Sequence, residues 1–252
     1  MNGSSYNEAA TVDANGIVTM ITDGSDGFAI YAKDKKTGVV GVYWINSENE
    51  NLKPASGSAW ASAELAKADA LGLIPESLVD ADLTQSITRA EFAAISVKAY
   101  EALSGTVALP NTVNPFTDTS DIEVLKAYNL GITTGVSATT FEPNTLLNRE
   151  QAATMLTRTF KRATMNGWTI QNDAQFALTY DKPSAFADDK DISDWAKDSV
   201  YFMAANNIIN GVGDNKFAPK NITSEEEATG YANATREQAL IIAVRMVENL
   251  KK

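Results

Sequence analysis

Hydrophobic residues recur at two different spacings along the chain, and the change between them lies near residue 55. Before that point, short segments rich in β-branched and aromatic residues alternate with turn sequences, a pattern typical of strands joined by hairpins. These segments are Ile17–Thr22, Phe28–Lys33 and Val39–Asn46. We therefore expect a small antiparallel β meander in residues 1–55, as a packing element or the remnant of an upstream domain, with a polar linker at Ser47–Gly57.

After residue 57 the apolar positions follow a helical period. Phe92, Ile95 and Ala99 lie on one stripe of a helix, and the segments 152–160 and 239–250 carry equivalent stripes. A helix whose apolar residues share one face buries that face against a neighbour. The pattern therefore predicts at least three helices that pack together.

These three helices begin with the same pattern. A capping residue precedes Glu or Gln by three positions, and Arg follows the capping residue at the first helical position. The copies are Thr88-Arg89-Ala90-Glu91, Asn148-Arg149-Glu150-Gln151 and Thr235-Arg236-Glu237-Gln238. Such a capping box satisfies two backbone amides at the start of a helix. Three copies with the same Arg indicate an internal repeat.

Other signals recur in step with these helices. Gly72, Gly131 and Asn207 each close a helix-like stretch, and Gly and Asn are the residues that most readily adopt the left-handed conformation of a helix C-terminus. Trp60 and Trp195 precede two of these caps by the same interval. We predict three repeats, at residues 56–110, 111–168 and 169–252, the last with an insertion near 222–232.

The motifs resemble those of the S-layer homology family, whose repeats combine Phe-x-Asp, a helix with Trp-Ala, a Gly-rich turn followed by Phe-x-Pro, and Thr-Arg-Ala-Glu. The resemblance covers roughly residues 57–252. It implies a mainly α fold in which three repeats form a pseudo-threefold assembly with a central helix bundle and loop prongs. The first repeat departs from the family pattern because it lacks the Gly-rich turn and Phe-x-Pro, and the second lacks the Trp.

The resemblance also implies a function. Family members are exported proteins of the bacterial cell surface, which attach noncovalently to the cell wall. Their ligand is a secondary cell-wall polysaccharide, commonly with pyruvate ketals on amino sugars, and it binds in grooves between repeats. The resemblance therefore implies a non-catalytic binding module with cell-wall polysaccharide as its partner, an upstream cargo domain, and no cofactor or metal. The ligand-binding residues it implies are Arg89, Arg149, Arg236, Asp118, Asp188, Trp60, Trp195, Gly135, Gly211, Gln151 and Gln238.

An Arg in the first turn of a helix needs an explanation. The positive end of the helix dipole disfavours it by about 0.3–1 kcal/mol, and free amides there attract anions. Two roles are open for each Arg. It can grip a ligand carboxylate with two parallel hydrogen bonds, or it can pair with an acidic residue of the neighbouring repeat, such as Asp118 or Asp188.

Structural roles also compete at the other candidate positions. Trp60 and Trp195 could stack on a sugar, but their place at a helix start favours core packing or a hydrophobic staple. Gly135 and Gly211 are favoured as residues that serve backbone geometry. The acidic run 188–194 lacks the Gly and Glu of a calcium-binding EF-hand loop, which favours helix capping over metal binding.

Composition narrows the classes of function. The chain has no cysteine and no histidine, which excludes disulfides, thiolate nucleophiles and catalysis by imidazole. A net charge of −11 argues against binding to nucleic acids or anionic membranes. No apolar run is long enough to insert into a membrane, and Met1–Ser5 does not begin a signal peptide. The chain is therefore either cytoplasmic or, as the resemblance implies, a trimmed form of an exported protein.

Two alternatives to an anchoring module remain open. One is a degenerate module that kept the fold and now binds proteins. The other is a glycan hydrolase that uses two carboxylates, which is disfavoured because the candidate acids occupy repeated capping positions rather than forming one unique pair.

Overall fold

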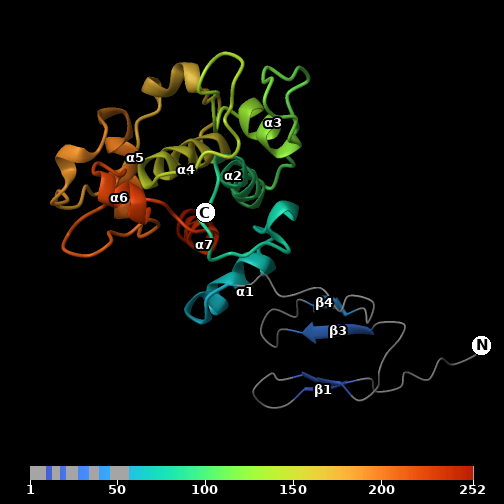
Figure 1. The fold of residues 1–252 in the computed structure, drawn as a ribbon. Coiled ribbons are helices and arrows are strands. Elements are labelled where there is room, and N and C mark those ends of the chain that lie inside the picture. The colour runs from blue at the N-terminus through green and yellow to red at the C-terminus, as the bar shows by residue number, and fades with distance from the viewer. Residues whose placement is uncertain (1–9, 13–17, 21–27, 34–39, 46–56, 252) are drawn as a thin grey trace, which may run out of the picture. The chain divides into compact units, whose positions relative to one another are not determined.

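The computed structural model describes residues 10–12, 18–20, 28–33, 40–45 and 57–251. The chain divides into two compact units, residues 1–53 and 54–252, which are taken separately below. Figure 1 labels the α-helices and most of the strands. All of the helices of the described residues belong to the second unit, so the predicted mainly α fold is confirmed.

The first unit contains two antiparallel hairpins. β1 (Ala10–Val12) pairs with β2 (Val18–Met20), and β3 (Phe28–Lys33) pairs with β4 (Val40–Ile45). The prediction of one continuous meander is therefore wrong, because in the described segments β2 pairs with β1 and not with β3. With only three residues, β1 is too short for an alternating pattern to be recognised. The predicted linker at Ser47–Gly57 lies outside the described residues except for Gly57.

The described residues of the second unit, 57–251, form seven α-helices and several short 3₁₀ segments. Three long helices start at the predicted capping boxes, and shorter helices precede them in the chain. The bounds are η1 (Ala59–Ala61), α1 (Ser62–Ala70), η2 (Glu76–Leu78), α2 (Arg89–Ser104), α3 (Ile122–Asn129), α4 (Arg149–Thr164), η3 (Ile170–Gln175), η4 (Asp189–Asp191), α5 (Asp194–Ala205), α6 (Ser224–Thr229) and α7 (Arg236–Leu250).

The local signals that predicted these helices are confirmed. All three capping boxes form, and each predicted Arg is the first helical residue. Gly72, Gly131 and Asn207 adopt positive φ angles of 66°, 76° and 55° at the ends of α1, α3 and α5. Short-range hydrogen bonds thus define where these helices start and stop.

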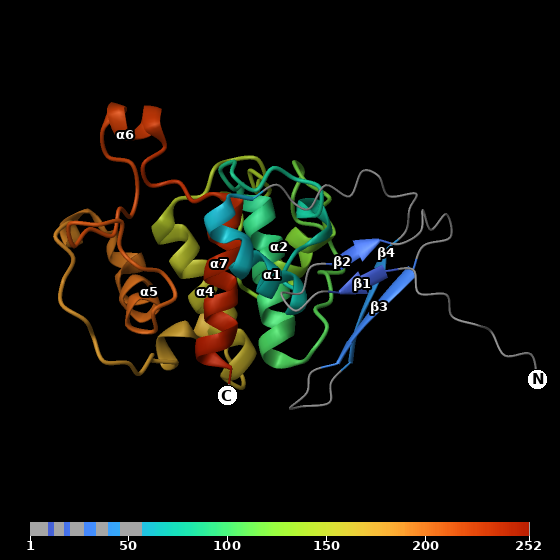
Figure 2. The same cartoon turned by 90° about the horizontal axis from the view of Figure 1, so that it is seen from below.

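Helices α2, α4 and α7 form the centre of the unit, where they lie side by side (Figure 2). Each shorter helix packs on the central helix of the preceding predicted repeat: α3 on α2, α5 on α4, and α1 on α7. The contact of α1 with α7 closes this series into a ring. The pseudo-threefold symmetry and the repeat boundaries stay predictions.

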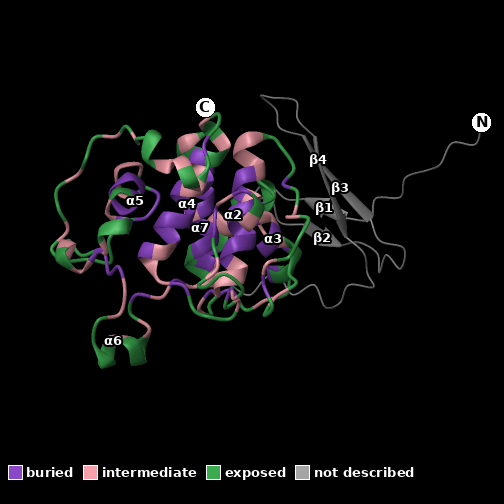
Figure 3. Cartoon of the chain, turned by 90° about the horizontal axis from the view of Figure 1, so that it is seen from above, coloured by how far each residue is buried: buried purple, intermediate pink, exposed green. Residues whose placement is uncertain are grey.

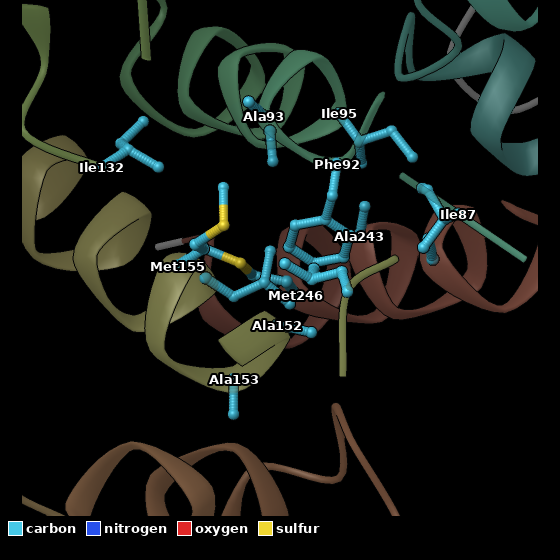
Figure 4. Close-up of a cluster of buried hydrophobic side chains, with 14 of the residues drawn as sticks. Ile87, Phe92, Ala93, Ile95, Ile132, Ala152, Ala153, Met155, Ala243 and Met246 are labelled. Carbon is cyan, nitrogen blue, oxygen red and sulfur yellow. The ribbon is translucent and has the colours of Figure 1, made fainter. Parts of the chain in front are cut away.

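Large and small apolar side chains alternate where the central helices meet. Phe92 of α2, Met155 of α4 and Met246 of α7 are almost fully buried, and Ala152 and Ala243 lie beside them (Figure 4). Small residues let the helices approach closely, while each buried large side chain contributes about 1.5–3 kcal/mol. The buried residues concentrate on these inner faces, whereas α6 is exposed and projects from the unit (Figure 3).

The segments that precede the three central helices pair with one another. We call residues 86–88, 146–148 and 233–235 the collar. β-Bridges join Ser86 to Thr235, Thr88 to Leu146, and Asn148 to Asn233, so each collar segment pairs with both others. The Ile87 amide donates to Ala234 O at 2.9 Å, and the Leu147 amide to Ile87 O at 3.2 Å. The collar therefore brings the starts of α2, α4 and α7, with their arginines, to one end of the bundle.

Candidate functional site at the helix junctions

The first-turn arginines reach from one predicted repeat to another. Arg89 Nη2 donates to Thr134 O at 2.6 Å, and its guanidinium carbon lies 4.8 Å from the centre of the Phe141 ring. Arg149 repeats this arrangement, since its Nη2 donates to Asn210 O at 2.5 Å and its guanidinium carbon lies 5.1 Å from the Phe217 ring centre. Its Nε donates in addition to Phe217 O at 2.8 Å. Both arginines thus hold the loop of the following repeat in place through hydrogen bonds and a cation–π contact.

Arg236 has a different kind of partner. Its Nε and Nη2 donate to Glu91 Oε1 at 3.0 and 2.7 Å, and its Nη1 donates to Asp82 O at 3.0 Å. This ion pair joins α7 to α2 across most of the sequence. The side chains are 20% and 15% exposed, so water screens the pair only partly.

Backbone amides at the helix starts are already occupied. The Arg89 amide donates to Thr145 O at 2.9 Å and the Ala90 amide to Pro143 O at 3.0 Å. At α7, the Arg236 amide donates to Gln85 O and the Glu237 amide to Leu83 O, both at 2.9 Å. The expectation that free first-turn amides attract an anion is therefore wrong at α2 and α7, because loop carbonyls occupy them. An anion can meet only the guanidinium groups there.

We call the place where each first-turn Arg contacts another predicted repeat a junction. The three junctions differ in how the charge of the Arg is balanced. Among the hydrogen bonds and ion pairs of the described residues, neither Arg89 nor Arg149 has a carboxylate partner, whereas Arg236 has Glu91. Burial lowers the pKa of both Arg89 and Arg149 from the usual value, because it disfavours the charged form. At two of the three junctions, therefore, the Arg is partly removed from water, and carbonyl oxygens and an aromatic ring take the place of the water.

The third residue of each central helix explains this difference. Glu91 Oε2 accepts from the Thr88 amide at 2.9 Å in the capping box, which leaves Oε1 for Arg236. The equivalent residues Gln151 and Gln238 use their single amide oxygen for the capping box, each at 3.2 Å, and carry no charge. The structure thus places Gln151 and Gln238 in capping boxes.

Asp118 and Asp188 stabilise the loops of their own repeats by accepting hydrogen bonds from loop amides. Asp118 accepts from the Phe141 amide at 2.9 Å and the Glu142 amide at 2.7 Å, and these hydrogen bonds lower its pKa. Asp188 accepts from the Phe217 and Ala218 amides, both at 2.8 Å. No hydrogen bond or ion pair among the described residues joins either Asp to an Arg, so the pairing considered from the sequence is wrong and the acidic partner found is Glu91. Glu142 and Ala218 have positive φ angles of 61° and 56°, and the Asp side chains hold these strained turns.

Gly135 and Gly211 serve backbone geometry, as the sequence favoured. A Cβ on Gly135 would lie 2.3 Å from Ser137 O, and one on Gly211 would lie 2.5 Å from Lys216 O. Only a residue without a side chain permits these tight loop closures. Since Thr134 O and Asn210 O accept from Arg89 and Arg149, the two glycines follow directly the carbonyls that the arginines clamp.

The prediction that Trp60 and Trp195 pack in the core is wrong. They are 63% and 59% exposed. Each Trp lies two residues after a Ser, Ser58 or Ser193, that is hydrogen-bonded to a buried carboxylate. With the Ser held in this way, the indole lies on the outside. An exposed Trp beside a junction offers a flat apolar face to a sugar ring.

Those buried carboxylates, Glu150 and Glu237, were missed as site residues in the sequence. They are only 2% and 4% exposed. Glu150 accepts from the Ser193 amide and hydroxyl, both at 2.9 Å, and Glu237 accepts from the Ser58 amide and hydroxyl at 2.8 and 2.9 Å. Such partners offset the cost of burying a charge. A Ser two residues before Trp, present in both copies, was the available signal.

The contacts between Glu and Ser connect two sets of candidate residues. Arg149 precedes Glu150, which binds Ser193, two residues before Trp195; Arg236, Glu237, Ser58 and Trp60 form the second set. At Arg89 the next residue is Ala90, and no Trp takes part. Only the first of these sets combines an Arg that lacks a carboxylate partner among the described residues with an exposed Trp.

Comparison with known proteins agrees with the motifs. The family model for the S-layer homology domain matches residues 115–153 and 185–229. The exoglucanase XynX of Acetivibrio thermocellus is 32% identical over 160 residues, which is 62% of this chain and 13% of that enzyme. The amylopullulanase of Thermoanaerobacterium thermosulfurigenes is 28% identical over 169 residues, or 65% of this chain and 8% of the enzyme. The chain thus spans a small part of these relatives.

Proposed function

Since the chain carries S-layer homology domains, we propose that it is a non-catalytic module that attaches a protein to the bacterial cell wall by binding a secondary cell-wall polysaccharide. S-layer homology domains anchor proteins to the cell wall. The finer part of the proposal is the ligand, an acidic polymer with pyruvate ketals on amino sugars, and its place at the helix junctions. Export to the cell surface and an upstream cargo domain belong to the same proposal.

One observation carries this proposal: Arg149 has carbonyl and aromatic partners and no carboxylate partner among the described residues, and the next residue, Glu150, binds Ser193, two residues before the exposed Trp195. A pyruvate ketal offers a planar carboxylate, which a guanidinium binds more strongly than a neutral carbonyl. Trp195 can stack on the sugar ring that bears the ketal. Because the chain carries a net charge of −11, an acidic polymer binds through such local sites and not through overall attraction.

The Arg89 junction offers the same unmatched guanidinium without a Trp, so we assign it a weaker share of binding. At the Arg236 junction Glu91 already supplies the carboxylate. We therefore propose that Arg236 mainly joins α7 to α2, and that Trp60 contributes contact area beside it. Asp118, Asp188, Gly135 and Gly211 shape the loops that the arginines hold.

Calorimetry with isolated cell-wall polysaccharide tests this assignment. Arg149→Ala should weaken binding by about tenfold or more, because charge-assisted hydrogen bonds contribute about 1.5–3 kcal/mol. The matched control is Arg245→Ala, which removes the same charge from α7 away from the junctions. Circular dichroism verifies that both variants keep their helices. Equal affinities of the two folded variants would contradict the role of Arg149.

A further inference from the structure

A polar pocket lies between α3 and the segment that follows α4. Its volume is about 370 Å³, within the range of about 300–1,000 Å³ that is typical of small-molecule sites. Hydroxyl and amide side chains dominate its lining, and one cation joins them. The lining includes Tyr128, Asn129, Thr133, Thr134, Arg162 and Gln171.

No carboxylate lines this pocket, although acidic residues outnumber basic ones by 32 to 21 in the chain. Arg162 Nη1 donates to Trp168 O at 3.2 Å, and its other nitrogens have no hydrogen-bond partner among the described residues. Arg162 lies in the last turn of α4, where a cation also stabilises the helix. That role explains an Arg at this position, but it does not explain a lining that contains no acidic residue.

Two more arginines belong to helices that supply or bind lining residues, Arg158 on α4 and Arg89 on α2. Arg158 is one helical turn before Arg162, on the same face of α4, and it has no hydrogen bond or ion pair within the described part of the chain. Arg89 Nε is buried and has no hydrogen-bond partner. The oxygens that do hold Arg89, Thr134 O and Thr133 Oγ1, belong to residues that line the pocket. Arg162 is therefore the cation of the lining itself, and Arg89 binds two of the lining residues from outside the cavity.

The wall formed by the segment after α4 is fixed in place. Asp173 Oδ1 accepts from Lys161 Nζ at 2.7 Å and from Trp168 Nε1 at 2.6 Å. Trp168 is fully buried, and a Cβ on Gly131 would lie 3.6 Å from its ring. These contacts preform the pocket, which lowers the entropy that a ligand must lose on binding.

We propose that this pocket binds an acidic monosaccharide unit, a pyranose that bears a carboxylate, with Arg162 as the residue that receives the carboxylate. The amides and hydroxyls of the lining match the hydroxyls of the sugar, and the guanidinium of Arg162 matches its charge. The proposal deepens the proposed function, on which it rests in taking the ligand to be a glycan. It adds a site distinct from the Arg149 junction.

Titration of the folded chain with glucuronate, followed by amide NMR shifts, tests the proposal, with glucose as the neutral control. Glucuronate should shift the amides of residues 129–134 and 169–171, and glucose should bind at least about tenfold more weakly. Arg162→Gln should weaken glucuronate binding by about tenfold or more, and Arg245→Gln should leave it unchanged. Equal binding of the two sugars, or equal behaviour of the two variants, would overturn the assignment.

A second variant keeps the test decisive if Arg162→Gln loses stability. Gln171 is exposed on the pocket wall, so Gln171→Glu places a negative charge there without changing the core. It should abolish the preference for glucuronate, whereas Gln171→Ala should retain it; an unchanged preference in Gln171→Glu would contradict the proposal. Failure of the pocket assignment leaves binding to wall polysaccharide through Arg149 intact. Conversely, Arg162-dependent glucuronate binding without any binding to wall polysaccharide would reject the proposed function alone.

Discussion

Glu91 accepts hydrogen bonds on both carboxylate oxygens, from the Thr88 amide and from Arg236. Burial alone would raise the pKa of Glu91, but the hydrogen bonds and the charge of Arg236, together with the Thr88 amide, outweigh it and lower the pKa below its usual value. A lowered pKa in the folded state means that the ionised carboxylate stabilises the fold. That stabilisation is present above the pKa of an unfolded Glu, about 4.3, and is lost as the pH falls through the folded value.

We therefore predict that Glu91→Gln lowers the free energy of unfolding at pH 7 by about 1–3 kcal/mol. The substitution keeps the capping box, as Gln151 and Gln238 show. The difference between the wild type and the variant should shrink as the pH falls below about 4, where the unfolded chain takes up a proton before the folded chain does, and it should disappear once the pH is below the lowered pKa of folded Glu91. Urea denaturation at pH 7, 5 and 3 measures it. A difference that is as large at pH 3 as at pH 7 would contradict the ion pair.

Gly135 is a residue that the local backbone restricts to glycine. Gly135→Ala places a methyl group 2.3 Å from Ser137 O and 2.7 Å from Thr140 O, so the loop must shift. We expect a loss of about 1–3 kcal/mol of stability. Ala138→Ser, in the same exposed loop, should change stability by less than about 0.5 kcal/mol. Thermal unfolding of the two variants compares them, and equal midpoints would show that the loop adapts at no cost.

At the scale of elements, the closure of α1 on α7 depends on Glu237. Its carboxylate binds the amide and the hydroxyl of Ser58, and this contact fixes the start of the first helical segment. Glu237→Ala leaves these donors without their partner, which costs about 1–3 kcal/mol locally.

We predict that amide exchange in residues 58–70 becomes about tenfold faster or more in Glu237→Ala, while α5 keeps its protection because Glu150 still binds Ser193. Hydrogen–deuterium exchange by mass spectrometry resolves the two segments. Glu225→Ala, on the exposed helix α6, serves as the control. Uniform acceleration in α1 and α5 alike would indicate general destabilisation rather than a local closure.

The elements that the sequence predicted well are those with short-range signals. The starts of α2, α4 and α7 follow from capping boxes within four residues, and the ends of α1, α3 and α5 from one Gly or Asn. Contacts between distant residues were not predictable in the same way. The partner of Arg236 lies 145 residues away in Glu91, and the exposure of Trp60 depends on a contact between Ser58 and Glu237 that spans 179 residues. Periodicity carries no information on such pairs.

At the scale of the whole molecule, the contacts run in one direction around the central helices. The central helix of each predicted repeat donates hydrogen bonds to a loop of the next repeat. Arg89 donates to the loop of the second repeat and Arg149 to the loop of the third. Arg236 of the third repeat donates to residues 82–85 of the first. The junctions therefore resemble one another in backbone geometry. They differ in charge because the third residue of the central helix is Glu in α2 and Gln in α4 and α7. Under the proposed function, we therefore expect a repeated scaffold to bind one acidic polymer at sites of unequal strength.

Sedimentation with cell-wall sacculi tests the central claim most directly. Sacculi that retain their secondary polysaccharide should pull down the protein, and sacculi from which that polymer has been stripped should not. Arg149→Ala should reduce sedimentation with intact sacculi, while Arg245→Ala should behave as the wild type. Equal binding of the wild type to intact and stripped sacculi would contradict attachment through the polysaccharide.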